Sequence, residues 1–211
     1  MRDHMRRLMA GLALLSAAAC ADSTAPAKQP NETGEQKPQD QLTFLQLGLN
    51  TPGLAATTTT FWAKVGEDRE VRLYYRPRAG RSDSTEYLRF RVRPRSLLKR
   101  PNGTAFATGD SIQITITVSD PVKLIVDFQP SGLQFDPSDP ARLKLSFHEK
   151  SGDLNDDGKV DASDTTVKGK IAIWKQESSS LPWFQLTSVL LESSDEIEAS
   201  ITGFTTYAVA Y

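Results

Sequence analysis

From residue 57 to its end, the chain is built from short segments in which apolar and polar side chains alternate. The clearest is 111–118, where Ile112, Ile114 and Ile116 are separated by single polar residues. A period of two places every second side chain on the same face of an extended strand. The alternation therefore predicts strands that bury one face and leave the other in solvent.

Turn-forming residues separate these segments, and no stretch shows the longer period of an amphipathic helix. Many short strands broken by Gly, Pro, Asp and Ser are typical of an all-β fold, here an antiparallel β-sandwich. The chain of 211 residues is long enough for one such domain with a proper core, over residues 41–211. The predicted strands are 57–65, 70–75, 87–93, 111–118, 123–128, 142–147, 168–175, 184–191, 196–201 and 207–211.

Residues 1–19 have the composition of a secretory signal peptide. A basic start precedes the apolar stretch 8–19, which is too short to cross a bilayer as a helix. Small residues then lead to Cys20, and the stretch 15–20 resembles the lipobox of bacterial lipoproteins. It departs from the lipobox at Ala17, where leucine is usual, and an ordinary signal peptidase also accepts this sequence. We expect lipidation of Cys20, with an unmodified cysteine as the alternative.

The stretch 20–40 is rich in Pro, Gln, Glu and Lys and has little to bury, which predicts a disordered tether. Because Cys20 is the only cysteine, no intrachain disulfide can form. We expect an exported protein, lipid-anchored at a bacterial outer membrane or cell surface, or alternatively periplasmic or secreted. The lipid anchor is the only expected membrane contact, and a formal net charge of -1 argues against nucleic acid as a partner.

The acidic stretch 153–164 carries the strongest functional motif, because its oxygen-bearing residues recur at the spacing of a calcium-binding loop. Ca²⁺ prefers six to eight oxygen ligands, and Gly158 stands where such loops need a sharp turn. Lys159 would offer its backbone carbonyl, and Asp161 would act directly or through a water. The predicted ligands are Asp153, Asn155, Asp157, Lys159, Asp161 and Asp164.

With five Asp and one Lys, the loop 153–164 has a net charge of −4 and repels itself unless a cation sits inside it. Calcium bound only by the folded form stabilises that form by mass action. We expect a structural role, in which calcium pins a long hairpin between strands 142–147 and 168–175. A sensor role is disfavoured, because no paired helices are expected that could open. A solvated acidic turn is the alternative interpretation.

The order D-x-N-x-D-G-x-V-x-x-x-D resembles one calcium repeat of dockerins, the calcium modules of cellulosomes. It departs from the usual EF-hand at Asp164, where glutamate is common. A dockerin has two such loops, each followed by a helix, whereas one loop is visible here. The stretch 165–174 that follows is rich in β-branched residues, which predicts a strand. The resemblance therefore implies the EF-hand-like loop alone, without the dockerin fold or its cohesin partner.

Two further regions carry short recognisable motifs: the run P-x-G-x-x-F…P-A-x-L in 130–143, and the closing strand 201–209. Together they resemble the ZU-five domain. The resemblance spans roughly residues 60–211 and implies a β-sandwich that makes protein contacts. Some members cut themselves at a Phe-Ser bond with the help of a preceding histidine. Thr205 takes the serine position here, but Gly203 replaces the histidine, so we expect no self-cleavage.

Three other groups of side chains have a functional and a structural interpretation. Arginines at alternate positions of 89–93 fit an anionic ligand, but a solvated sheet face is the preferred interpretation. His148 is expected at the surface. Trp62, Trp174 and Trp183 fit a sugar-stacking platform, although packing in or beside the core is preferred. Trp174 is out of phase with Ile171 and Ile173, which places it on the opposite face of its strand, partly exposed.

These features predict a non-enzymatic, calcium-binding lipoprotein of the cell envelope. Its β-sandwich would serve as a structural or protein-interaction module. A carbohydrate-binding module of the cell surface is the alternative. The partner is expected to be an envelope protein or a glycan.

Overall fold

A computed structural model describes residues 32–48, 50–150 and 152–211, so the predicted signal peptide and Cys20 lie outside the described residues. The helices are η1 (Gln39–Gln41, 3-10) and α1 (Ala162–Lys168). The strands are β1 (Glu32–Lys37), β2 (Thr58–Lys64), β3 (Arg69–Tyr74), β4 (Glu86–Val92), β5 (Leu97–Lys99), β6 (Ser111–Asp120), β7 (Ile125–Gln129), β8 (Gln134–Phe135), β9 (Ala141–Ser146), β10 (Ala172–Gln176), β11 (Trp183–Leu186), β12 (Ser188–Leu191), β13 (Glu196–Ile201) and β14 (Thr206–Ala210). Within this described part, no helix has the length and apolar character needed to span a membrane.

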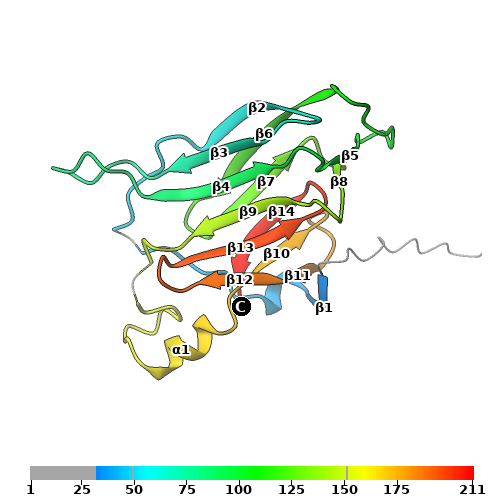
Figure 1. Cartoon of the computed structure of the whole chain (residues 1–211). Helices are drawn as coiled ribbons and strands as arrows, with labels where there is room; N and C mark the ends of the chain where they lie inside the picture. The colour runs from blue at the N-terminus through cyan, green and yellow to red at the C-terminus, as the bar shows by residue number, and fades with distance from the viewer. Residues whose placement is uncertain (1–31, 49, 151) are drawn as a thin grey trace, which may run out of the picture.

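Two antiparallel sheets pack face to face as a β-sandwich (Figure 1). The larger sheet has the strand order β1-β11-β10-β14-β7-β6-β2, and the smaller sheet has the order β12-β13-β9-β4-β3. β5 and β8 form a separate two-stranded pair. The predicted all-β, antiparallel sandwich is confirmed, and most predicted strands agree with the observed bounds within a few residues.

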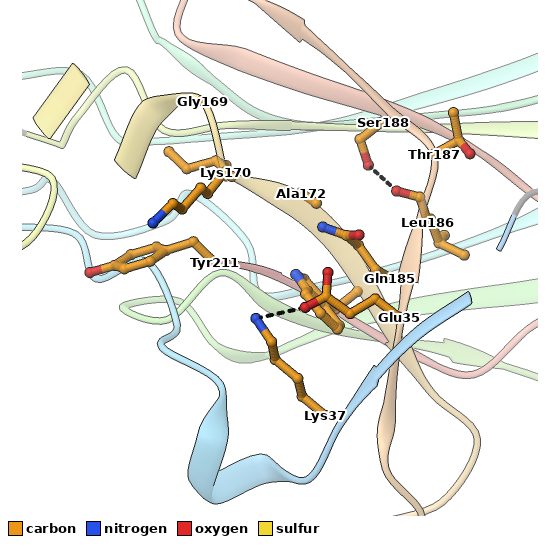
Figure 2. A pocket seen from close by; sticks show the side chains of 12 residues that line it. Glu35, Lys37, Gly169, Lys170, Ala172, Gln185, Leu186, Thr187, Ser188 and Tyr211 are labelled. Atoms are coloured by element: carbon orange, nitrogen blue, oxygen red, sulfur yellow. Dashed lines mark hydrogen bonds and ion pairs between the residues drawn. The ribbon is translucent and has the colours of Figure 1, made fainter. Parts of the chain in front are cut away.

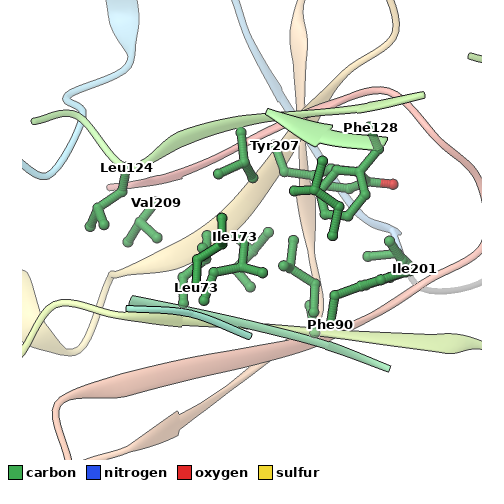
Figure 3. Packing of buried hydrophobic residues seen from close by; sticks show 14 of the residues in the cluster. Leu73, Phe90, Leu124, Phe128, Ile173, Ile201, Tyr207 and Val209 are labelled. Atoms are coloured by element: carbon green, nitrogen blue, oxygen red, sulfur yellow. The ribbon is translucent and has the colours of Figure 1, made fainter. Parts of the chain in front are cut away.

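The main core lies between the two sheets. Phe90 on β4 is fully buried, with its ring 5.0 Å from Phe128 and 5.7 Å from Phe204. Figure 3 shows Phe90 and Leu73 of the smaller sheet facing Phe128 and Tyr207 of the larger sheet. Each fully buried side chain of this size contributes about 1.5–3 kcal/mol relative to an exposed one. The alternation in the sequence thus becomes two apolar faces that meet.

A second apolar cluster covers part of the outer face of the larger sheet. Trp174 on β10 and Trp183 on β11 are 0% and 2% exposed, and both pack with Leu42. The Trp174 indole donates a hydrogen bond to the carbonyl of Ala210 at 3.1 Å, and the Phe44 ring lies edge-on to Trp183 at 5.4 Å. Trp174 does lie on the face opposite Ile173, but its predicted partial exposure is wrong, because residues from the N-terminal segment cover it.

Strand β1 lies inside the stretch 20–40 that the sequence predicts as a disordered tether. It pairs with the edge strand β11, with Glu32 opposite Leu186 and Lys37 opposite Trp183. Its composition is polar because it adds backbone hydrogen bonds to the edge of a sheet rather than a core face. The folded body therefore begins before residue 41.

The stretch 165–174, predicted as a strand, is helical in its first part. Helix α1 begins after the N-cap Asp161, whose side chain accepts a hydrogen bond from the N–H of Ser163 at 2.8 Å. Asp164 accepts in return from the N–H of Asp161 at 2.8 Å, which completes a capping box. These bonds satisfy amides at the start of the helix and outweigh the strand preference of its β-branched residues.

The segment 184–191, predicted as one strand, is divided between the two sheets. Strand β11 belongs to the larger sheet and β12 to the smaller one, with Thr187 between them. The hydroxyl of Ser188 donates to the carbonyl of Leu186 and accepts from the N–H of Ile173, both at 3.0 Å. These bonds fix the chain where it passes from one sheet to the other.

Candidate metal centre

The predicted calcium loop 153–164 lies where the chain crosses between the sheets. It follows β9 of the smaller sheet and leads through α1 to β10 of the larger sheet. The prediction that it forms the tip of a hairpin is wrong, because β9 and β10 belong to different sheets. Leu154 in the loop and Val167 in α1 are buried in the main core. Two apolar side chains therefore fix the loop and its helix to the sandwich.

The first and last predicted ligands both turn inward onto the backbone of the loop. The two carboxylate oxygens of Asp153 accept from the N–H groups of Asp157 at 3.1 Å and Gly158 at 2.8 Å. Asp164 is 5% exposed, and its Oδ1 accepts from the N–H of Leu154 at 2.6 Å. Asp164 thus connects the end of the loop to its beginning.

The middle ligands fold around the same turn. The Asn155 Oδ1 accepts from the N–H of Asp157 at 3.2 Å, and the Asp157 Oδ1 accepts from the N–H of Lys159 at 2.9 Å. Gly158 has a φ of 84°, in the region that favours glycine, as the predicted reversal requires. The structure therefore brings Asp153, Asn155 and Asp157 together through shared amides.

Ser163 is a contact that the sequence motif does not reveal. Its hydroxyl donates to the Asp161 Oδ1 at 2.7 Å and lies 2.9 Å from the Asn155 Nδ2. Ser163 thus connects the capping box of α1 to the middle of the loop. The sequence does contain a signal for this contact, because a serine two residues after an N-cap aspartate can hydrogen-bond to its side chain.

Hydrogen bonds and charges in the loop shift the pKa values of two of its aspartates and of a nearby tyrosine. The backbone N–H of Asp161 lowers the pKa of Asp164, with further help from two amides of the loop. The hydroxyl and N–H of Ser163 lower the pKa of Asp161, against the opposing charge of Asp164. Burial raises the pKa of Tyr211, and the negative charges of the loop raise it further. The negative electrostatic potential of the loop therefore extends to Tyr211.

One internal cation partly balances these charges. The ammonium group of Lys150 is buried and pairs with Asp156, which is not among the predicted ligands. A buried lysine is stable as a cation only beside such a partner. Nothing in the spacing of the motif indicates this pair, because Lys150 lies before the loop.

The residues fit calcium in chemistry and order, since every predicted ligand is an oxygen donor and Gly158 permits the turn. The side-chain oxygens are nevertheless directed at amides of the loop. Across residues 32–48, 50–150 and 152–211, no group of three or more His, Cys, Asp or Glu side chains is arranged to hold a metal ion. A carboxylate oxygen that accepts one hydrogen bond keeps a second lone pair, so these contacts do not block coordination.

A cavity of about 610 Å³ lies next to the end of α1 (Figure 2). Lys170 and Tyr211 line one side, and the ion pair of Glu35 with Lys37, at 3.1 Å, lines another. The Lys37 ammonium lies 5.1 Å from the centre of the Trp174 ring. None of the predicted calcium ligands lines this cavity, so it is separate from the loop.

The other candidate residues from the sequence make contacts that fit a structural role. The Thr205 hydroxyl is buried and donates to the carbonyl of Gln176, and Phe204 packs in the core. The Nδ1 of His148 lies 3.9 Å from a carboxylate oxygen of Asp195 near the surface. Arg91 pairs with Asp68 at 2.5 Å, as expected of a solvated sheet face.

Comparisons with known proteins add no family to this description. The chain matches no family model, no curated protein and no solved structure. The fold defines the chain as an antiparallel β-sandwich with a helix-flanked acidic loop, and the ZU-five and dockerin resemblances stay predictions.

Proposed function

We propose that loop 153–164 binds Ca²⁺ and that the protein is an exported, non-enzymatic β-sandwich of the cell envelope, anchored through a lipid on Cys20. Its role is that of a structural or interaction module. The observation that carries the calcium proposal is the closed loop, in which Asp153 and Asp164 both turn inward and α1 follows directly. A helix after the loop also makes the segment more similar to a dockerin repeat than the sequence alone predicts.

Calcium in this position would act as a cross-link between the sheets. Asp153, Asn155 and Asp157 would supply side-chain oxygens from the β9 side of the loop. Asp161 and Asp164 would supply them from the α1 side, and Lys159 would offer its carbonyl. The loop carries a net charge of −4, so its carboxylates repel one another and destabilise the folded form. A bound divalent cation would remove this repulsion. At a free concentration a hundred times its dissociation constant, calcium stabilises the folded form by about 2.7 kcal/mol.

The absence of catalysis is part of the proposal. The one hydroxyl with a family precedent as a nucleophile, that of Thr205, is buried and donates to a backbone carbonyl. A nucleophile needs an adjacent base to activate it, and Gly203 stands where the related family carries histidine.

Thermal unfolding of the purified protein in calcium and in EDTA tests this function. We expect EDTA to lower the melting temperature, calcium to restore it, and Asp157→Ala to abolish the difference. Asp83→Ala is the matched control, because Asp83 is an exposed aspartate far from the loop in sequence. Identical melting curves in calcium and EDTA for the unmodified chain would contradict the proposal.

A further inference from the structure

The outer face of the larger sheet has two chemically different halves. Over β10, β11 and β14 it carries the apolar cluster around Trp174, which Leu42 and Phe44 help to cover. Over β2 and β6, at the opposite end of the sandwich from α1 (Figure 1), its outward side chains stay exposed or half-buried. This second half is therefore accessible to a ligand.

Cross-strand pairs of small polar side chains make up the accessible half. Thr58 lies opposite Thr117 and Thr60 opposite Thr115, with hydroxyl oxygens 3.5 and 3.0 Å apart. The inward neighbours Phe61 and Ala63 are buried, so the hydroxyls all point away from the core. Six outward side chains of β2 and β6 form what we call the threonine–tryptophan face: Thr58, Thr60, Trp62, Gln113, Thr115 and Thr117.

Trp62 is the one large side chain of this face. It lies opposite Gln113 and is 60% exposed, whereas Trp174 and Trp183 are buried. An indole left in water contributes little to folding, and exposed aromatic rings of this kind carry much of the energy in binding interfaces. Trp62 is therefore the expected anchor of a ligand.

The charge of the two outer faces selects the chemistry of that ligand. On the smaller sheet, arginines and carboxylates alternate, as in Arg72 with Glu70 at 2.5 Å and Arg142 with Glu198 at 2.8 Å. The six residues of the threonine–tryptophan face carry hydroxyl, amide and indole groups without a formal charge. The charged neighbours on the same outer face already have partners: Lys64 pairs with Glu67 at 2.7 Å, and Asp127 accepts a hydrogen bond from the Thr206 hydroxyl. A neutral ligand rich in hydroxyls therefore complements this face better than an ionic one.

We propose that the threonine–tryptophan face binds an uncharged polysaccharide chain. Each threonine hydroxyl donates one hydrogen bond and accepts others, which matches the hydroxyls of a sugar ring. The apolar face of a sugar ring would pack on the Trp62 indole, whose N–H offers a further donor. From Thr58 to Trp62 the strand extends about 13 Å, enough for a short run of sugar rings.

This inference rests on the proposed role as an envelope binding module, and it does not require calcium in the loop. The full chain is run in native gels that contain dextran, galactomannan or mixed-linkage β-glucan, with polygalacturonate as the charged comparison. We expect retardation by at least one neutral polysaccharide. Trp62→Ala should raise the dissociation constant about tenfold, and Thr115→Val about threefold. Val189→Ala, which removes an exposed apolar side chain from the other sheet, should leave it unchanged.

The inference would be overturned by no retardation by the neutral polysaccharides, by retardation by polygalacturonate alone, or by equal binding of Trp62→Ala and the unmodified chain. Self-association that Trp62→Ala abolishes, without glycan binding, would also overturn it and assign the face to a second copy at edge strand β2. The melting temperature of each variant in calcium and EDTA is measured in parallel. A retained calcium response with lost glycan binding separates this inference from the calcium proposal.

Discussion

The sandwich body and the acidic loop are held together by different forces. In the body, apolar side chains from two sheets meet, and Phe90 alone contacts the rings of Phe128, Phe135 and Phe204. The loop 153–164 has Leu154 as its buried apolar residue and relies on carboxylates that accept backbone N–H groups. Body stability should therefore depend on shape and volume, and loop stability on charge, protons and metal.

The largest effect tests the body. Phe90→Ala removes a fully buried ring at the centre of the aromatic cluster and leaves a cavity. We expect a loss of about 3–5 kcal/mol in the free energy of unfolding, measured by urea denaturation. Val189→Ala, at an exposed position of the same sandwich, should change it by less than about 0.5 kcal/mol. A loss for Phe90→Ala no larger than that of the control would show that the ring cluster does not hold the sheets together.

The body was predictable because its determinants are local in sequence. A period of two, read along 87–93 or 111–118, reflects the burial of one face, and turn residues mark the ends of each strand. The order of the strands in each sheet was not predictable in this way. Pairings such as β1 with β11 join residues far apart in the chain, and no local pattern records them.

The loop shows the opposite balance. The spacing of its candidate ligands matches a calcium-loop motif, and their binding of calcium stays a prediction, whereas the structure after them was predicted wrongly. Thr165, Thr166 and Val167 favour a strand by propensity, while the helix is set by the capping box of Asp161 and Asp164. The motif predicts both aspartates as metal ligands only, so it does not indicate their capping role. Burial of Trp174 was missed for a related reason, since its cover, Leu42, lies in a distant segment.

A smaller effect than that of Phe90→Ala is expected at the end of the loop. Asp164→Asn replaces one of two accepting oxygens by an NH₂ group, which cannot accept from the N–H of Asp161 or Leu154. In EDTA we expect the melting temperature to fall by a few degrees and amide exchange in the loop to rise. Asp161→Asn is the matched control, because asparagine is as good an N-cap as aspartate.

If the proposed calcium site is occupied, both variants should respond to calcium less than the unmodified chain, since each loses a proposed carboxylate ligand. The comparison between body and loop fails if Asp164→Asn and Asp161→Asn behave alike in EDTA. That result would mean that the hydrogen bonds of Asp164 do not fix the loop.

The smallest expected effect is a dependence of stability on pH that belongs to the loop. In the folded chain, backbone N–H groups that donate to Asp164 hold its pKa below the usual aspartate range, and the hydroxyl and N–H of Ser163 do the same for Asp161. A carboxyl with a depressed folded pKa stabilises the fold above its unfolded pKa of about 3.9 and loses this contribution as the pH falls through the folded value. Stability in EDTA should therefore decline below about pH 4.

Asp164→Asn should flatten that decline, because one of the responsible carboxyls is gone, while Phe90→Ala should lower the whole curve without changing its acid slope. Urea midpoints of the three proteins between about pH 5 and 2.5 measure this. Calcium should move the decline to lower pH, since metal and protons compete for the same oxygens. An acid slope identical in the unmodified chain and Asp164→Asn would place the pH dependence in the body, where Lys144 pairs with Glu196 at 2.6 Å.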